Sequence, residues 1–102
     1  MSGIRIKTRL RDDVAQVRSI IRHPMETGFR VNRETAEVIP AHYIQLVSIT
    51  HNEKIVMECD WSRAVSKNPY LSFEFSGAKT GDSLSLTWVD NFGETETTSV
   101  TI

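Results

Sequence analysis

The single cysteine and the three histidines are the side chains of this sequence best suited to carry chemistry. Cys59 offers a thiol, which as a thiolate attacks electrophiles and binds soft metals, and His23, His42 and His51 offer nitrogen ligands. Their spacing does not support a metal centre, because no HxH, HxxxH or CxxC pattern occurs and the four residues are scattered along the chain. We therefore expect neither a metal nor a cofactor.

Cys59 itself is expected to be structural. It alternates with Met57 and Trp61, so its side chain is predicted to point into an apolar core, where a thiol has a raised pKa and little reactivity. Serine and threonine are frequent near the C-terminus, but the sequence contains no GxSxG or HExxH motif. A hydrolase is not indicated, and we expect that the protein is not an enzyme.

The segment HPMETG, residues 23–28, is a further candidate site. Proline restricts the residue before it to extended conformations, and glycine permits a positive φ, so the segment fits a rigid turn at the end of a strand. It also opens a long irregular stretch, residues 23–40, and long loops often carry function. Met25 either plugs the edge of the fold or offers an adaptable contact at a binding surface, and the residues alone leave both readings open.

Alternating apolar and polar residues predict that β-strands position these groups. Seven strands are expected, at residues 4–11, 14–21, 41–50, 54–61, 70–77, 83–90 and 94–102. Most of them are separated by turn signals such as Asp12-Asp13 and Asp90-Asn91-Phe92-Gly93. The pattern predicts an all-β fold, an immunoglobulin-like antiparallel β-sandwich with one domain over residues 1–102.

The same alternation predicts which side chains face the core. The inward residues are expected to be Ile4, Ile6, Leu10, Ala15, Val17, Ile21, Ile55, Met57, Cys59, Trp61, Leu71, Phe73, Phe75, Leu84, Leu86 and Trp88. The odd positions of residues 4–11 are all basic. That face is either an ordinary solvated surface or a docking site for an acidic partner.

Composition narrows the class of protein. At 102 residues the chain has room for one core, and 39% hydrophobic with 25% charged residues is ordinary for a soluble domain. Twelve basic and 13 acidic residues give a net charge of −1, which does not favour nucleic acid as a partner. No stretch approaches the roughly 20 apolar residues that span a bilayer, and the N-terminus has no apolar run of signal-peptide length. Taken alone, these features predict a cytoplasmic protein that is not bound to a membrane.

Three segments carry a resemblance to a known family. IIRHPMETG, NPYLSFEFSG and LTWVDNFGETETTSVTI, in this order and spacing, resemble the SoxZ family, subunits of the SoxYZ sulfur-carrier complex of thiosulfate-oxidising bacteria. The likeness extends over nearly the whole chain and includes the opening strand IRIKTRL.

The resemblance implies a non-catalytic subunit that pairs with SoxY and adopts an immunoglobulin-like sandwich. In that family the oxidised sulfur is held by a cysteine on a mobile C-terminal arm of SoxY. The chain has no such arm, so Cys59 is not expected to be the carrier. The pair presents its sulfur adduct in turn to heme-containing, hydrolytic and dehydrogenase Sox enzymes. The resemblance also implies a periplasmic location, reached by export with SoxY, and an isolated chain that self-associates or binds SoxY.

The surface expected to contact partners has two parts. It comprises His23, Pro24, Met25, Glu26, Thr27 and Gly28 together with Asn68, Pro69 and Tyr70. Loops at the end of a sandwich can flank a partner's extended tail, and an aromatic side chain adds contact area.

Two other classes of function use a sandwich of this kind. A metal-binding sandwich of superoxide-reductase type uses four histidines and one cysteine, and this chain has three histidines. A sandwich that binds a ligand on its own needs an exposed aromatic platform, whereas Trp61 and Trp88 are both predicted to face inward.

Overall fold

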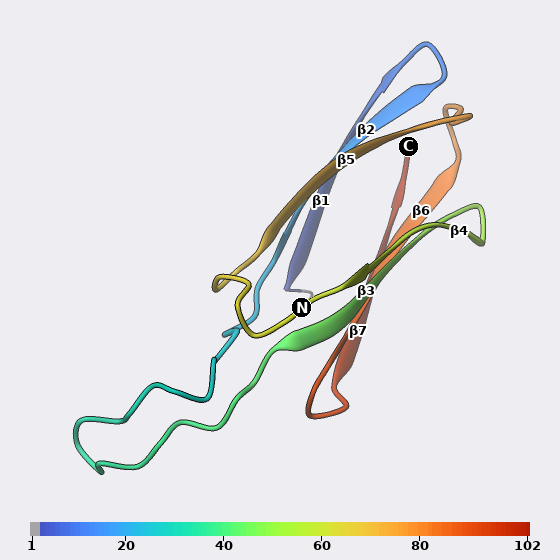
Figure 1. Ribbon diagram of the computed structural model, residues 1–102. Coiled ribbons are helices and arrows are strands. Elements are labelled where there is room, and N and C mark those ends of the chain that lie inside the picture. Colours follow the sequence, from blue (N-terminus) through green and yellow to red (C-terminus); the bar gives the residue numbers. More distant parts are fainter. Residues whose placement is uncertain (1–2) are drawn as a thin grey trace.

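The computed structural model describes residues 3–102, which form seven β-strands in two facing antiparallel sheets (Figure 1). The strands are β1 (Ile4–Arg11), β2 (Val14–Ile21), β3 (Ile44–His51), β4 (Lys54–Asp60), β5 (Tyr70–Ser76), β6 (Ser83–Asp90) and β7 (Thr95–Thr101). The predicted all-β, immunoglobulin-like sandwich is confirmed. Residues 3–102 include no helix with the length and apolar character needed to cross a membrane.

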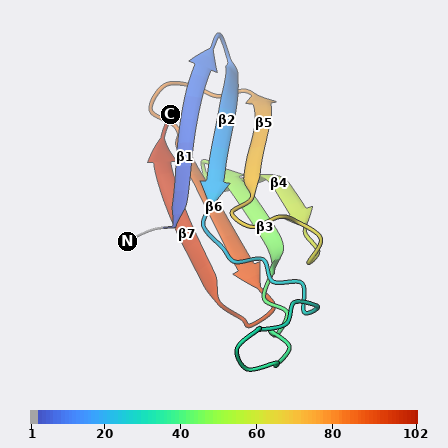
Figure 2. The same cartoon turned by 90° about the vertical axis from the view of Figure 1, so that its left-hand side faces the viewer.

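The strand order separates the sandwich into a smaller and a larger sheet. One sheet has the order β1-β2-β5, and the other has the order β4-β3-β6-β7, as Figure 2 shows with the smaller sheet toward the viewer. The smaller sheet contains a hairpin, β1-β2, whose register runs from Ile4 opposite Ile21 to Arg11 opposite Val14. Because successive side chains in a strand point to opposite sides, this register places one complete set of apolar residues between the sheets.

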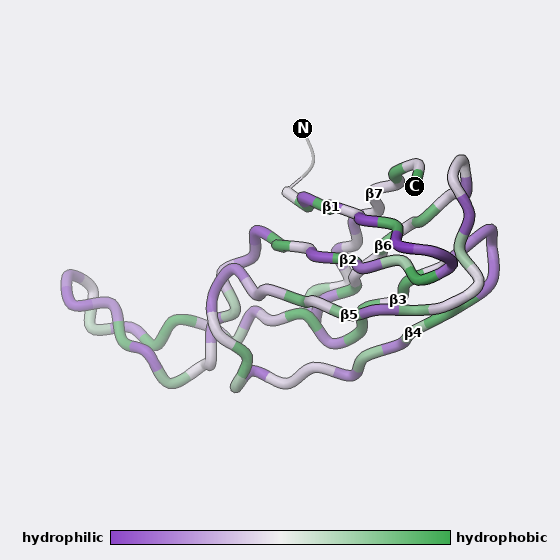
Figure 3. Tube along the Cα trace, turned by 90° about the horizontal axis from the view of Figure 1, so that it is seen from above, coloured by the Kyte–Doolittle hydropathy of each residue, from purple (hydrophilic) through white to green (hydrophobic). Residues whose placement is uncertain are grey.

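The core is built from these inward positions. Its buried members include Ile4, Ala15, Val17, Ile21, Ile44, Val47, Ile49, Leu84, Leu86 and Trp88. Ile6, Met57, Cys59, Trp61, Leu71, Phe73 and Phe75 are partly buried and pack against this core. Apolar and polar residues alternate along β1 and β2 (Figure 3), so the inward positions predicted from the sequence are confirmed for these strands.

One predicted core residue is wrong. Ile55 is 61% exposed, although the alternation of β4 places it on the same face as Met57 and Cys59. The pairing of β3 with β4 shifts between Ile49 and Thr50, so Thr50 pairs with Ile55 while Ile49 pairs with Met57. The extra residue reverses the orientation of the strand before the bulge, which turns Ile55 outward.

Part of the long segment between β2 and β3 folds back on itself as a narrow ribbon of two paired chain segments. Residues 29–40, here called the protruding hairpin, extend away from the sandwich (Figure 1). Val31 bridges Val38, and the backbone N–H of Asn32 donates to the carbonyl of Glu37 at 2.8 Å. The molecule measures 54 × 24 × 20 Å along its principal axes, so this hairpin contributes to a markedly elongated shape.

Candidate functional site

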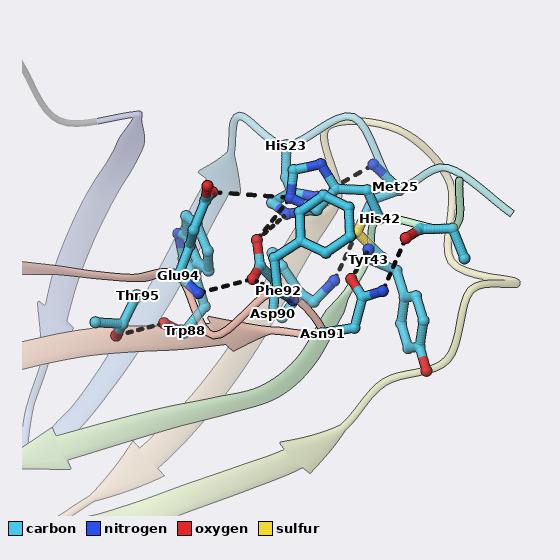
Figure 4. Close-up of polar contacts among 12 residues, drawn as sticks. His23, Met25, His42, Tyr43, Trp88, Asp90, Asn91, Phe92, Glu94 and Thr95 are labelled. Carbon is cyan, nitrogen blue, oxygen red and sulfur yellow. Dashed lines mark hydrogen bonds and ion pairs between the residues drawn. The ribbon is translucent and has the colours of Figure 1, made fainter. Parts of the chain in front are cut away.

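Asp90, the last residue of β6, gathers two histidines at the base of the protruding hairpin (Figure 4). Its Oδ2 lies 3.1 Å from Nε2 of His23 and 2.7 Å from Nε2 of His42. His23 follows β2 and His42 precedes β3, so one carboxylate connects the two ends of the β2–β3 connection to the larger sheet. We call these three residues the Asp90 clamp.

Asp90 is almost fully buried, with 2% of its surface exposed. Burial by itself raises the pKa of its carboxyl group, but hydrogen bonds from His23 and His42 outweigh that effect. Oδ1 accepts two further bonds, from the backbone N–H groups of Phe92 at 3.0 Å and Glu94 at 2.9 Å. The pKa of Asp90 therefore lies below its usual value, and the folded state favours the ionised carboxylate.

Hydrogen bonding fixes where the proton of His23 resides. The backbone N–H of Met25 donates to Nδ1 of His23 at 3.1 Å, so Nδ1 is unprotonated and the proton of the neutral ring is on Nε2. Nε2 then donates to Asp90. A metal bound at Nε2 would need the lone pair of that nitrogen. Because Nδ1 already accepts the bond from Met25, the ring would then have to lose its only proton. His23, His42 and Asp90 have ligand atoms within 4.8 Å of one another, but their hydrogen bonds fit shared protons better than a metal ion.

Aromatic contacts hold the two histidine rings. His23 meets His42 edge to face with ring centroids 4.6 Å apart, and meets Trp88 in the same way at 5.1 Å. His42 stacks on Phe92 at 4.1 Å with an interplanar angle of 17°. Because packing and hydrogen bonds both fix the rings, the Asp90 clamp is rigid.

Met25 closes the edge of the sandwich. Its side chain is 5% exposed, belongs to the main core cluster, and accepts a hydrogen bond through sulfur from the backbone N–H of Ile44 at 3.3 Å. The residue has a φ of +49°, which residues other than glycine, asparagine and aspartate rarely adopt. Core burial and the bond to His23 hold this conformation, so the structure supports the edge-plug reading of Met25.

Gly28 is required where the chain leaves the base of the hairpin. Its φ is +87°, and a Cβ built there would lie 3.1 Å from Cβ of Ala41. Glu26 and His42, just below it, pair through two backbone hydrogen bonds of 2.6 and 3.0 Å. The two chain segments therefore approach closely, and a side chain at this position would strain both the backbone and the contact.

The HPMETG segment meets the Asn68-Pro69-Tyr70 segment in space. The backbone N–H of His23 donates to Oδ1 of Asn68 at 3.1 Å, and the N–H of Asn68 donates to the carbonyl of His23 at 3.0 Å. The N–H of Ile21 donates to the carbonyl of Pro69 at 3.0 Å. Two motifs that are far apart in sequence thus form one continuous structure.

Exposure divides the expected partner-binding residues into two groups. His23, Met25 and Pro69 are buried, so they shape the site from inside. Glu26, Thr27 and Gly28 are half-buried, and Pro24, Asn68 and Tyr70 are exposed. Contact with a partner through this second group remains a prediction.

Sequence patterns did not indicate Asp90 as a site residue or the pairing of His23 with His42. Asp90 was read as part of a turn, and its Oδ1 does hold that turn. Nothing in the spacing showed that Oδ2 reaches residues 67 and 48 positions away. The protruding hairpin was also missed, although Phe29, Val31 and Val38 are exposed apolar residues in an otherwise polar stretch.

Cys59 is placed as its alternation predicts. It lies in the edge strand β4, opposite Val47, and packs half-buried against the core. Burial, with a smaller contribution from the charge of Asp60, raises the pKa of its thiol. The thiolate is therefore disfavoured, which is the opposite of what a sulfur nucleophile needs.

A second histidine–aspartate pair lies at the far end of β3. Nε2 of His51 is 2.7 Å from Oδ2 of Asp82, and the backbone N–H of Lys79 donates to the same oxygen at 2.8 Å. The hydrogen bond from His51 is the main cause of a lowered pKa at Asp82. Both side chains are partly open to water, unlike those of Asp90 and His23.

The fold and this site define a class of protein: an immunoglobulin-like β-sandwich with a buried clamp at the base of a protruding hairpin. A comparison with known families matches residues 4–101 to the family described as sulphur oxidation protein SoxZ. The chain belongs to the SoxZ family and therefore has a role in the Sox sulfur-oxidation system. No curated protein matches it.

Proposed function

We propose that this chain is the non-catalytic subunit of a SoxYZ-type heterodimeric sulfur carrier. It pairs with SoxY, whose C-terminal cysteine holds the sulfur adduct, and helps to present that adduct to heme-containing, hydrolytic and dehydrogenase Sox enzymes. The pair acts in the periplasm, which the chain reaches by export with SoxY. Membership of the SoxZ family supports this proposal, and so does the raised pKa of Cys59, which suits a structural thiol.

The observation that carries the pairing is the apolar surface of the protruding hairpin. Phe29 is 76% exposed, and Val31 and Val38 are exposed beside each other across the ribbon. Arg63 lies over the Phe29 ring at 5.0 Å, yet Phe29 and the two valines stay exposed and open to another molecule, and such residues form the centres of protein interfaces. The proposed contact surface includes this hairpin and, at its base, Pro24, Glu26, Thr27, Gly28, Asn68 and Tyr70.

Matched serine variants test this surface in complexes with SoxY from the same genome. Val31→Ser with Val38→Ser should weaken binding about tenfold or more, a change of about 1.4 kcal/mol. Ile55→Ser with Val56→Ser removes two exposed aliphatic side chains from the opposite end and should change the Kd less than about twofold. Failure of the wild-type chain to bind SoxY at all would refute the pairing, and equal effects of the two double variants would exclude the hairpin as the contact.

Intact mass under non-reducing conditions tests the role of the thiol. After incubation of the complex with the Sox enzymes and thiosulfate, sulfur additions should appear on SoxY, and Cys59→Ser should leave them unchanged. Additions on Cys59 itself would contradict the non-catalytic assignment. Cell fractionation tests the location, since the chain should leave the periplasmic fraction when the signal of SoxY is removed.

A further inference from the structure

The outer face of the β1-β2-β5 sheet is strongly cationic. Side chains that point away from the core include Arg5, Lys7, Arg9 and Arg11 on β1 and Arg18 on β2, and all five are exposed. We call these five residues the cationic face. The only carboxylate among the outward positions of these three strands is Glu74 on β5. A chain with a net charge of −1 therefore concentrates positive charge on one of its two sheets.

This charge arrangement does not serve the stability of the fold. Lys7 lies directly opposite Arg18 in the β1–β2 register, and like charges at opposite positions destabilise a sheet. Within residues 3–102, no side chain of the cationic face forms an ion pair. The other sheet differs, since its outer face has paired hydroxyl groups, Ser85 with Ser99 and Thr87 with Thr97, each at 2.8 Å.

We propose that the cationic face is a docking surface for an acidic protein. It is separate from the protruding hairpin and adjoins the proposed SoxY contact at Tyr70. A shallow hollow on this face is lined by Arg5, Lys7 and Arg18 together with the exposed pair Ile20 and Tyr70. Ile20 pairs with Tyr70 across β2 and β5, so the hollow combines cations with an apolar corner. Guanidinium groups bind carboxylates in two-point contacts, and an apolar corner gives a protein interface its dry centre.

Nucleic acid and anionic membranes fit the face less well. Glu74 lies opposite Gln16 within the face, where it would repel a phosphate backbone or a sheet of anionic lipid. Tyr70 is the one aromatic residue at the outward positions of these strands, which is too few for a row of stacked bases. An acidic protein can place its own polar group opposite Glu74, so protein is the occupant to which the face is complementary.

Two triple variants of equal charge test this proposal. Lys7→Gln, Arg9→Gln and Arg18→Gln remove three of the five charges of the cationic face, and Lys54→Gln, Lys67→Gln and Lys79→Gln remove three charges that lie outside this face and outside the protruding hairpin. Binding of a fluorescent oligo-glutamate peptide is measured by anisotropy for the chain in complex with SoxY and for the chain alone. The face variant should bind about tenfold or more weakly, and the control variant within about twofold of wild type.

Ionic strength and competing polyanions complete the test. Raising ionic strength from about 0.01 M to about 0.15 M shortens the screening length from about 30 Å to about 8 Å, so it should weaken peptide binding to the wild type more than to the face variant. Equal losses in both triple variants would overturn the proposal, because net charge alone would then explain binding. Tighter, face-dependent binding to duplex DNA or to phosphatidylglycerol vesicles would overturn it in favour of that partner. These outcomes do not depend on whether the hairpin binds SoxY.

Discussion

The two ends of the sandwich contain the same contact in different surroundings. At one end, Nε2 of His42 lies 2.7 Å from Asp90, and at the other, Nε2 of His51 lies 2.7 Å from Asp82. Asp90 is buried and accepts four hydrogen bonds, whereas Asp82 is partly open to water at a turn. Equal distances therefore do not mean equal energies. Burial and the number of partners decide what each carboxylate contributes to the fold.

This difference has a functional counterpart. The Asp90 clamp holds both ends of a connection from which the protruding hairpin extends, while the His51–Asp82 pair closes short turns. A projecting ribbon that binds a partner loses less conformational entropy on binding when its base is already fixed. The buried clamp thus places rigidity where the proposed contact with SoxY requires it.

Replacement of Asp90 should show most clearly that the two ends of the sandwich differ in their contribution to stability. Asp90→Ala leaves four donors without an acceptor, two of them on histidine rings, and should lower the free energy of unfolding by about 3 to 5 kcal/mol. Asp82→Ala should cost much less, because water can replace the carboxylate. Urea unfolding followed by tryptophan fluorescence measures both. If Asp90→Ala does not fold, Asp90→Asn provides the comparison, and equal losses at the two ends would contradict the role of burial.

Truncation of two methionines compares packing beneath the protruding hairpin with packing in the edge strand β4. Met25→Ala should cost about 2 to 5 kcal/mol, because it removes a core side chain beneath the hairpin. Met57→Ala, in the half-buried edge strand β4, should cost less. Met25→Leu conserves volume and should recover most of the loss. Urea midpoints for the three variants measure these differences, and an effect of Met25→Ala no larger than that of Met57→Ala would argue against an edge plug.

Acid should weaken the fold through Asp90. Its pKa is lowered in the folded state, so its contribution is fully present above the unfolded value, about 3.9, and is lost as pH falls through the lower folded pKa. The free energy of unfolding should therefore decline from about pH 5 downward. This fall in the free energy of unfolding with pH should be shallower in Asp90→Asn than in wild type. Asp82→Asn should reduce it by a smaller amount. Identical pH profiles for the two variants would show that the Asp90 clamp has no special role in acid stability.

The fold was predictable because it depends on local patterns. The alternation in IRIKTRLR and SLSLTWVD predicted β1 and β6 with their observed bounds, since each pattern reports directly on one sheet face. Ile55 was misplaced because a bulge in β4 depends on the partner strand and interrupts the period of two.

The site was less predictable because its contacts are long-range. The backbone requirements of Gly28 and Asn68 follow from local conformation, and both have positive φ values. The clamp depends instead on the register of the larger sheet, which brings the end of β6 beside residues before β3. One sequence shows a histidine, a second histidine and an aspartate, but it does not show that strand pairing will bring them together.

A zinc titration should produce the smallest effect and tests the proton assignment at the Asp90 clamp. The bond from Met25 to Nδ1 keeps the His23 proton on Nε2, so a metal would have to displace a proton that Asp90 stabilises there. Equimolar Zn²⁺ should therefore leave the melting temperature of wild type unchanged, and His42→Ala should respond in the same way. If Zn²⁺ bound specifically to the folded state, the melting temperature of wild type would rise with zinc concentration, and that of His42→Ala would not. Such a rise would show that the two histidines and Asp90 exchange their shared protons for a metal ion.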